Sequence, residues 1–217
     1  MYSATGDKKY QDMMLGISEK VSDLTAMGYG ETGGLGSLSY MLGTYEKDAA
    51  FSARIKEAFE KKAAKLRKAA DNSGYHTAMR TYDYCWGSNM NVMKNGMILA
   101  ADEYMNGTDN REYIASQLHY LLGVNALGIS YITGTGEFRC NYPHLRPAFA
   151  DGIDECIPGM VAGGPNSRPA DPFAREVIAE GTPPMKCYAD DASSYSLNEI
   201  TIYWNSPAVF VLGYLCR

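Results

Sequence analysis

The spacing of hydrophobic positions predicts that the first 122 residues form helices. Apolar residues recur there at intervals of three and four, which is the period of a helix with one buried face. On this basis we expect helices over about residues 9–26, 35–45, 46–70, 90–105 and 110–122. A glycine follows the first and the last of these ranges, at Gly28 and Gly123, as is common where a helix ends.

The segment from residue 199 to residue 215 is apolar nearly all round, unlike the earlier amphipathic segments. This pattern predicts an inner helix buried on every side, with Pro207 either bending it or delaying its start. Alternation of amphipathic and strongly apolar helices suits a ring with an inner and an outer layer. Because neither a linker nor an internal repeat is visible, we predict a single all-α domain over residues 1–217.

The pattern changes between residues 123 and 197, where glycine and proline are dense and the helical period is lost. Within this region we expect one short strand, I-S-Y-I-T at residues 129–133. Long segments without regular structure inside a compact domain are usually functional loops. The change in composition therefore predicts a binding surface in this part of the chain.

The sequence G-Y-G-E-T-G, from Gly28 to Gly33, matches the G-x-G-x-x-G pattern of dinucleotide-binding loops. That fingerprint requires a strand before it, within a βαβ unit, and here a predicted helix precedes it. We therefore expect no dinucleotide site. The stretch is predicted to be a loop between two helices, in which the glycines permit positive φ angles.

Composition narrows the classes of function. The chain has 217 residues, of which 46% are hydrophobic, and a formal net charge of −5. A negative chain is a poor nucleic-acid binder, because phosphate neutralisation needs a basic face. The sequence contains no run of 18 or more apolar residues, the length needed to span a membrane, and the N-terminal residues lack the apolar core of a signal peptide.

Metal chemistry has little support in the sequence. The five cysteines are widely spaced without C-x-x-C, and no two of the three histidines lie at helical spacing. We therefore predict no metal site. The basic run from Lys61 to Lys68 is interpreted as a solvated helix face whose cations favour the helix dipole, in preference to a patch for anionic ligands.

The candidate chemistry lies at residues 188–206, Y-A-D-D-A-S-S-Y-S-L-N-E-I-T-I-Y-W-N-S. Carboxylates beside aromatic rings suit a sugar, whose ring stacks on aromatics and whose glycosidic oxygen needs a proton. The alternative is that these acids only cap helices or charge a first helical turn. A second aromatic segment, residues 75–89, either contributes to the same site or fills the core beneath a loop.

Four segments in this order resemble glycoside hydrolase family 9, the inverting cellulases with an (α/α)6 barrel. They are W-G-S-N at 86–89, residues 118–136, P-H-L-R at 143–146 with P-G-M-V-A-G-G-P-N at 158–166, and residues 188–206. The last segment fits the family's second signature at the expected intervals, with Tyr188, Asp190, Tyr195, Glu199, Thr201, Asn205 and Ser206. The resemblance implies an all-α fold that forms about half of such a barrel, with long loops between the last helices.

The resemblance also implies roles for individual residues. Glu199 matches the general acid that protonates the departing glycosidic oxygen, and Asp190 matches an aspartate that supports the acid's surroundings. His144 and Arg146 match the H-x-R pair that grips the sugar near the bond cleaved. Three aromatic side chains are predicted to offer stacking surfaces to the substrate: Trp86, Tyr195 and Trp204. An acid of this kind must hold its proton near neutral pH, and the negative charge of Asp190 and Asp191 would favour this.

Two departures from the family pattern stand out. The position five residues after Glu199 is usually tyrosine and is Trp204 here, which removes a hydroxyl group but keeps an aromatic surface. The D-A-G-D motif, which holds the family's catalytic base, is absent from these 217 residues. An inverting mechanism needs both carboxyl groups. We therefore expect the chain to be the C-terminal half of such a domain, supplying the acid without the base.

The resemblance implies further expectations about partners. The substrate is expected to be cellulose or a related β-glucan, and half a helical ring should associate with its missing N-terminal half or with itself, because its exposed apolar faces need cover. No cofactor is required for the implied reaction, and calcium is possible without a recognisable binding loop. The full-length parent is expected to be secreted or at the cell surface. The alternatives are a non-catalytic carbohydrate-binding module and a purely structural fragment of the same fold.

Overall fold

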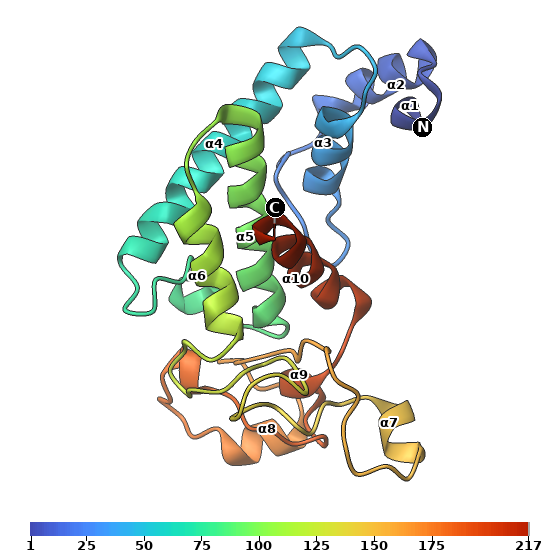
Figure 1. The fold of residues 1–217 in the computed structure, drawn as a ribbon. Helices are drawn as coiled ribbons and strands as arrows, with labels where there is room; N and C mark the ends of the chain where they lie inside the picture. The colour runs from blue at the N-terminus through green and yellow to red at the C-terminus, as the bar shows by residue number, and fades with distance from the viewer. Residues whose placement is uncertain (217) are drawn as a thin grey trace. The chain divides into compact units, whose positions relative to one another are not determined.

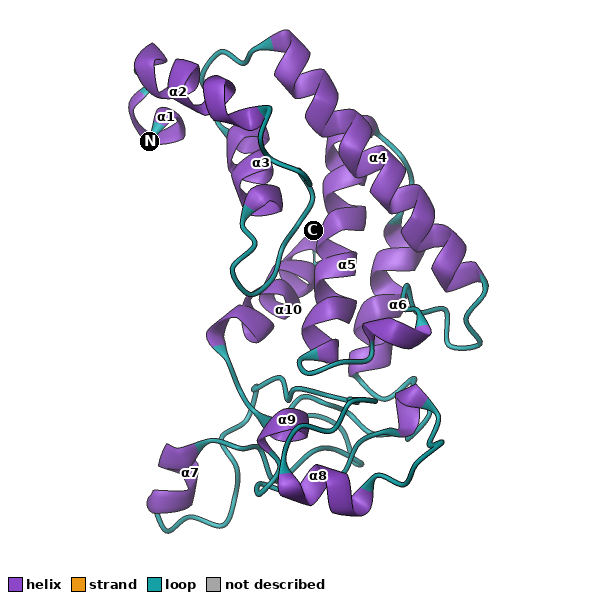
Figure 2. Ribbon diagram, turned by 180° about the vertical axis from the view of Figure 1, so that it is seen from behind, coloured by secondary structure: helices purple, strands orange, loops and turns teal. Residues whose placement is uncertain are grey.

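The computed structural model describes residues 1–216, except for the side chain of Phe149, and this part of the chain is helical without named strands (Figures 1 and 2). None of the helices in this part is both long and apolar enough to cross a bilayer. The α-helices are α1 (Tyr2–Thr5), α2 (Lys8–Ser18), α3 (Gly33–Leu42), α4 (Ala49–Asp71), α5 (Ser88–Asn106), α6 (Arg111–Leu121), α7 (Arg146–Ala150), α8 (Pro172–Val177), α9 (Tyr195–Asn198) and α10 (Ile202–Leu215). Two 3₁₀ turns, η1 (Thr81–Asp83) and η2 (Pro184–Lys186), complete the set.

The predicted helices over 46–70, 90–105 and 110–122 correspond closely to α4, α5 and α6. The first prediction, 9–26, is too long, because α2 ends at Ser18. Asp23 explains part of the difference, since its Oδ1 accepts hydrogen bonds from the backbone N–H of Thr25 at 2.8 Å and from the Thr25 hydroxyl at 2.6 Å. A side chain that binds the backbone in this way favours a turn over a helix.

The glycine-rich stretch before α3 differs from its prediction. Gly30 has a positive φ of 74°, but Gly33 and Gly34 form the first turn of α3. Their small size is needed for close packing, because a Cβ atom on Gly33 would lie 2.6 Å from the carbonyl oxygen of Asp23. One on Gly34 would lie 2.8 Å from the side chain of Met27. Glycine is therefore needed at these two positions because the chain packs closely there, and not because the backbone adopts a positive φ.

The predicted strand at residues 129–133 is wrong. Ser130 pairs with Arg139 and Ile132 pairs with Val161, but each is an isolated bridge. The pairing cannot extend because Gly134 and Gly136 follow with φ angles of 70° and 89°, which turn the chain away from an extended path. The segment is therefore a loop held by single backbone contacts.

The chain divides into two compact units, one formed by residues 1–65 and 98–110 and the other by residues 66–97 and 111–217. In the first unit α4 buries Phe51, Ile55 and Phe59, which are spaced by four residues as the periodicity predicts. The second unit contains α6 to α10 and the loops that join them. There α10 packs on α6, and Val211 lies close to Gly96 of α5, where a Cβ atom would come within 3.0 Å of Cγ2.

Helix α10 departs from its prediction in two ways. It begins at Ile202 and not at residue 199, and Thr201 caps it by accepting a hydrogen bond from the N–H of Trp204 at 3.2 Å. Pro207 lies inside the helix. Its second apolar face is exposed, with Ile202 90%, Val209 68% and Leu212 39% accessible. The helix is therefore not buried on every side in this chain.

Candidate functional site

The predicted acid, Glu199, lies between α9 and α10 in the second unit. Its φ and ψ of −54° and 147° are outside the helical region, so it is not at the start of α10 as predicted. Its backbone forms an isolated parallel bridge with His144. The local fold thus places two residues of the predicted site side by side, although they are far apart in the sequence.

Trp86 binds the carboxylate of Glu199 directly. Its indole Nε1–H donates a hydrogen bond of 2.9 Å to Oε2, across 113 positions of sequence. An indole N–H is only a donor, so this contact fixes Oε2 as an acceptor. When Glu199 is protonated, its carbonyl oxygen is the stronger acceptor, so this contact favours Oε1 as the oxygen that carries the proton. Trp86 was predicted as a stacking surface, and this hydrogen bond is an additional contact.

Tyr195, the first residue of α9, lies between two other predicted site residues. Its ring is 5.4 Å from the ring of Trp86 and 6.0 Å from that of His144, measured between centroids, and the latter pair meets edge to face. The half-buried Tyr195 and the 43% exposed Trp86 keep part of their surface open to solvent. Four of the predicted residues, Trp86, His144, Tyr195 and Glu199, are therefore brought together.

His144 is fixed by its backbone and by its ring. Its backbone N–H donates to the carbonyl oxygen of Asn198 at 2.7 Å, and Nδ1 lies 2.7 Å from the carbonyl oxygen of Ala192. A carbonyl oxygen can only accept, so Nδ1 carries the hydrogen. In the neutral ring this leaves Nε2 as an acceptor. Arg146, two residues later, begins α7 with an exposed side chain.

Asp190 acts on the backbone that leads to His144. Its two carboxylate oxygens accept hydrogen bonds from the N–H groups of Asn141, at 2.7 Å, and Tyr142, at 3.0 Å. Burial raises the pKa of Asp190, the two N–H donors offset part of this, and the charge of Asp191 raises it further. These contacts give Asp190 a role in holding the loop before His144, while its influence on Glu199 stays a prediction.

Trp204 does not lie where the sequence predicted. The side chain is only 2% exposed, which contradicts the predicted stacking of a sugar on its ring. Instead it lies beneath the turn that carries Trp86: a Cβ atom on Gly87 would come within 2.9 Å of the Trp204 ring, and one on Gly163 within 3.1 Å. A tryptophan predicts an aromatic surface, but only the fold shows which way that surface faces.

Two buried polar residues organise the site and were missed as functional candidates. Asn198 accepts a hydrogen bond of 2.6 Å from the Tyr188 hydroxyl and donates to the carbonyl oxygens of Ala189 and Asp191, at 2.7 and 2.9 Å. Together with the bond from His144, these contacts join residues 188–191 to the backbone next to Glu199. The residue type gave no signal for this role, because asparagine is common in turns.

Asp171 is the second of these residues, and it is fully buried. Its carboxylate accepts from the Ser194 hydroxyl at 2.8 Å, from the N–H and hydroxyl of Ser196 at 2.9 and 2.5 Å, and from the N–H of Ala174 at 2.7 Å. Burial by itself raises the pKa of Asp171, but these hydrogen bonds outweigh it and hold the pKa below its ordinary value. Asp-Pro at residues 171–172 predicts the start of a helix, and α8 begins there. The same dipeptide does not indicate that Asp171 also anchors α9.

No group of three or more His, Cys, Asp or Glu side chains within residues 1–216 is placed to hold a metal ion. The groups brought together here are an acid, a histidine and two partly exposed rings. A carboxylic acid such as Glu199, with Oε2 accepting a hydrogen bond from Trp86, can donate a proton to an oxygen atom of a bound substrate. Exposed aromatic faces beside hydrogen-bonding groups can hold a sugar ring.

Comparison with known proteins identifies the family of this chain. A model of glycosyl hydrolase family 9 matches residues 1–212. The chain is 39% identical over 228 residues to the cellodextrinase of Butyrivibrio fibrisolvens, which covers 98% of this chain and 41% of that protein. It is 35% identical over 198 residues to the cellulose 1,4-beta-cellobiosidase of Acetivibrio thermocellus, which covers 86% of this chain and 22% of that protein.

Solved structures show the same fold. A single mutant of a thermostable endoglucanase from Alicyclobacillus acidocaldarius matches with a TM-score of 0.90 at 31% identity, over 100% of this chain and 41% of that one. AaCel9A in complex with cellobiose-like isofagomine matches with a TM-score of 0.82 at 33% identity, over 90% and 37%. The prediction of an all-α chain that forms part of an (α/α)6 barrel is confirmed, and the chain spans less than half the length of these relatives.

Proposed function

Because the chain belongs to glycosyl hydrolase family 9, we propose that it supplies the acid half of a site that hydrolyses β-1,4-glucosidic bonds in cellulose or a related β-glucan, with inversion at the anomeric carbon. The observation that supports this most directly is the hydrogen bond from Trp86 to Glu199, next to His144 and Tyr195. It orients a carboxyl group beside aromatic surfaces, as protonation of a glycosidic oxygen requires.

In the proposed reaction Glu199 donates the proton on Oε1 to the glycosidic oxygen as the bond to the anomeric carbon breaks. Oε2 remains bound to the indole N–H of Trp86, which stabilises the negative charge left on the carboxylate. His144 Nε2 accepts a hydrogen bond from a sugar hydroxyl, and the exposed guanidinium of Arg146 donates to others. The rings of Trp86 and Tyr195 contact the faces of the sugar. This hydrolysis requires no cofactor.

The second carboxylate must come from outside this chain in the proposed mechanism. Inverting enzymes place the acid and base carboxyl groups roughly 6.5 to 9.5 Å apart, with the attacking water beside the base. The D-A-G-D motif expected to hold that base is absent from the sequence. We propose that the remaining N-terminal part of the domain supplies it, within a parent that is secreted or displayed at the cell surface.

The exposed face of α10 supports this partnership. Ile202, Val209 and Leu212 are spaced by seven and three residues, so they share one side of the helix, opposite the side that includes buried Trp204 and Val211. An apolar stripe on a helix of this length is normally covered in a folded protein. Helices of the missing segment would cover it, and in their absence the chain is expected to associate with itself.

The test combines this chain with an N-terminal segment of a family member that contains D-A-G-D. Alone, the chain is expected to hydrolyse cello-oligosaccharides feebly or not at all. The mixture is expected to elute as a complex in size-exclusion chromatography and to release products whose first-formed anomer, observed by proton NMR, is α. Glu199→Gln should reduce the rate by a factor of about 10² to 10⁴, the usual contribution of a general acid.

Glu112→Gln is the matched control, because Glu112 is an exposed glutamate in the first turn of α6, outside the predicted site. It should leave the rate unchanged. Full activity of the chain alone would overturn the assignment of the base to the missing segment. Binding of cello-oligosaccharides without cleavage, even in the complex, would instead favour a non-catalytic carbohydrate-binding module.

A further inference from the structure

The turn that presents Trp86 is anchored by a buried asparagine. Asn89 lies three residues after Trp86, in the first turn of α5, and it is fully buried. Its Nδ2 donates a hydrogen bond of 2.8 Å to the carbonyl oxygen of Ala162, and its backbone N–H donates one of 3.0 Å to that of Gly163. Two hydrogen bonds from one residue thus attach the turn to residues 161–164, which we call the anchor segment.

The anchor segment also packs closely against the side chain of Asn89. Gly164 has a positive φ of 92°, and a Cβ atom there would lie only 2.4 Å from Cγ of Asn89. Glycine is therefore needed at position 164 both for its backbone conformation and for this contact. Because the amide group of Asn89 lies directly against the backbone, it has little freedom to adopt another rotamer.

The anchor segment holds the chain on either side of Glu199 as well. Before the acid, the N–H of Gly164 donates to the carbonyl oxygen of Leu197 at 2.8 Å. After the acid, Oδ1 of Asn205 in α10 accepts the N–H of Val161 at 2.9 Å. The segment that binds the turn of the indole donor thus also binds both flanks of the carboxylate acceptor, and this fixes the distance between donor and acceptor.

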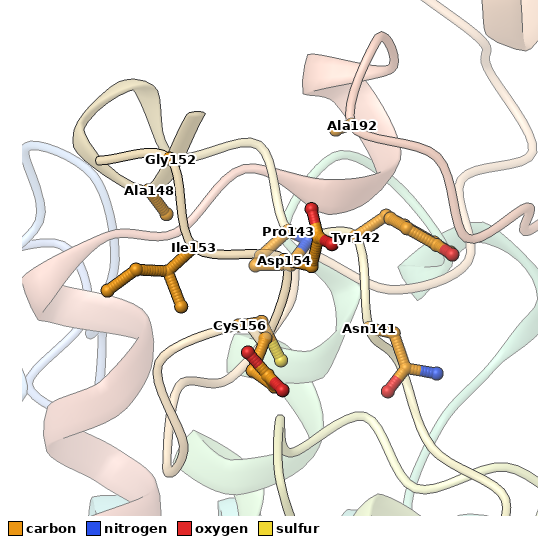
Figure 3. A pocket seen from close by; sticks show the side chains of 10 residues that line it. Asn141, Tyr142, Pro143, Ala148, Gly152, Ile153, Asp154, Cys156 and Ala192 are labelled. Atoms are coloured by element: carbon orange, nitrogen blue, oxygen red, sulfur yellow. The ribbon is translucent and has the colours of Figure 1, made fainter. Parts of the chain in front are cut away.

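The histidine of the site has an anchor of its own. Figure 3 shows Asn141 and Tyr142 in the loop that carries His144, and their N–H groups donate to the carboxylate of Asp190. The contacts of Asn89 give it the corresponding place on the element that carries the indole donor. Each of the two elements beside the acid is therefore held by one polar side chain.

Asn89 is an unfavourable choice of residue for stability alone. Its Oδ1 and the hydroxyl of the neighbouring Ser88 are buried and find no hydrogen-bond partner among the described residues. A buried polar atom that lacks a partner lowers the stability of a fold. Residues that break the ordinary rules of polar burial are expected at functional sites, so this observation favours a role beyond stability.

We propose that Asn89 is a positioning residue for the acid, because it holds Trp86 where the indole N–H meets Oε2 of Glu199. The inference rests on the proposed function, in which Glu199 transfers the proton. Without the Asn89 amide, the turn loses a fixed position on the anchor segment, and the hydrogen bond of 2.9 Å between Trp86 and Glu199 weakens. Asn89 is buried away from the substrate, so its loss should lower kcat more than it changes KM.

The first test observes the indole N–H signals of the purified chain by NMR. The chain has two tryptophans, so Trp86→Phe assigns the two signals. Glu199→Gln gives the position of the Trp86 signal without the charge of the carboxylate. Asn89→Ala is expected to shift the Trp86 signal toward that position, because the indole N–H no longer meets the carboxylate closely.

Asn95→Ala is the matched control. Asn95 is a buried asparagine of the same helix, and its Nδ2 also donates to a backbone carbonyl oxygen, that of Ala78 at 2.7 Å. Its replacement should lower the stability of the chain as Asn89→Ala does, but it should leave the Trp86 signal in place.

The second test measures kcat and its pH profile with the N-terminal segment present. Asn89→Ala should lower kcat by about tenfold, the contribution of one hydrogen bond to a charged group, and should alter the pH profile as Trp86→Phe does. In the Trp86→Phe background, Asn89→Ala should have no further effect on kcat, because the hydrogen bond that it supports is already absent.

An unmoved Trp86 signal in Asn89→Ala, or an equal shift in Asn95→Ala, would overturn the positioning role and leave the proposed function intact. Independent losses in the double variant would also contradict it, since Asn89 would then act only through stability. If Asn89→Ala does not fold, Asn205→Ala removes the anchor from the side of α10, and an unmoved Trp86 signal there rejects the inference. Full activity of Glu199→Gln would instead refute the proposed function, whatever the indole signal shows.

Discussion

Helix α4 and the loops of residues 123–201 are stabilised in different ways. In α4, side chains such as Phe51, Ile55 and Phe59 repeat at one spacing, and each is at most 6% exposed. In the loops many fully buried residues are polar, such as Thr133, Asp171 and Asn198, and each binds atoms outside its own turn of the chain. The helix depends on many similar contacts, whereas each loop depends on a few unique ones.

Because of this difference, single substitutions should alter the site more readily in the loops than in α4. Loss of one apolar side chain from a helix lowers the free energy of unfolding, but the remaining contacts keep the helix in place. Loss of one buried hydrogen-bonding residue from a loop removes several of the few contacts that fix a segment. Substitutions in the two regions should therefore separate a loss of stability from a loss of activity.

Ile55→Ala is expected to lower the free energy of unfolding by about 2–5 kcal/mol, because Ile55 is fully buried and the smaller side chain leaves a cavity. The activity per folded molecule, measured with the N-terminal segment present, should not change. Urea unfolding followed by circular dichroism gives the free energy. Ile17→Ala, at a 62% exposed position of α2, is the control and should change it by less than about 0.5 kcal/mol. A loss of activity per folded molecule in Ile55→Ala would contradict the contrast.

Asp171→Asn is expected to lower the free energy of unfolding by about 2–4 kcal/mol at neutral pH, because an amide cannot accept all the hydrogen bonds from Ser194, Ser196 and Ala174. Unlike Ile55→Ala, it should also lower the activity per folded molecule, since it frees the segment that leads to Glu199. Asp12→Asn removes only an exposed ion pair with Lys8 in α2, so it should change the free energy of unfolding by less than about 1 kcal/mol and leave the activity unchanged.

The effect of Asp171→Asn should depend on pH. The pKa of Asp171 is lowered on folding, so its carboxylate contributes its full stabilisation above the unfolded pKa of about 3.9. That contribution is lost as the pH falls below this value and through the folded-state pKa. The difference in unfolding free energy between the wild type and Asp171→Asn should therefore shrink between about pH 4 and pH 2. A constant difference over that range would show that the carboxylate charge is not the stabilising feature.

Trp86→Phe keeps an aromatic ring but removes the N–H that binds Glu199. The transition state is expected to lose about 1.5–3 kcal/mol, which is the range for a hydrogen bond to a charged group. This loss should appear in kcat and its pH profile more than in KM, because the ring that contacts the sugar remains. Tyr82→Phe, at an exposed aromatic position nearby, should leave both constants unchanged. A change in KM alone would indicate that Trp86 acts only as a stacking surface.

The same contrast explains what could be predicted from the sequence. Periodicity was sufficient for α4, α5 and α6, because many residues report on each helix. The family resemblance placed Glu199, His144 and Tyr195 in one site, where the structure brings them together with Trp86. The hydrogen bond between Trp86 and Glu199 could not be predicted, since it joins positions 113 residues apart and follows no period.

Buried polar contacts were the least predictable part of the site. Asp171 and Asn198 resemble ordinary capping and turn residues in the sequence, because the sequence does not show that Asp171 binds Ser194 or that the backbone of Asn198 binds His144. Trp204 was misplaced for a related reason: residue type indicates a large apolar surface, but the direction of that surface depends on the packing of α10 against residues 87 and 163.

The contact between Trp204 and Gly87 has a consequence for exchanging parts between relatives. Gly87 has a φ of 78°, and a Cβ atom there would lie 2.9 Å from the Trp204 ring, so a larger residue at position 87 meets both backbone strain and a steric clash. A smaller residue at position 204 would remove the support from beneath the turn that presents Trp86. A chimeric enzyme that takes position 87 from one relative and position 204 from another should lose more stability and activity than the separate effects of the two changes predict. The two positions should therefore be transferred as a pair.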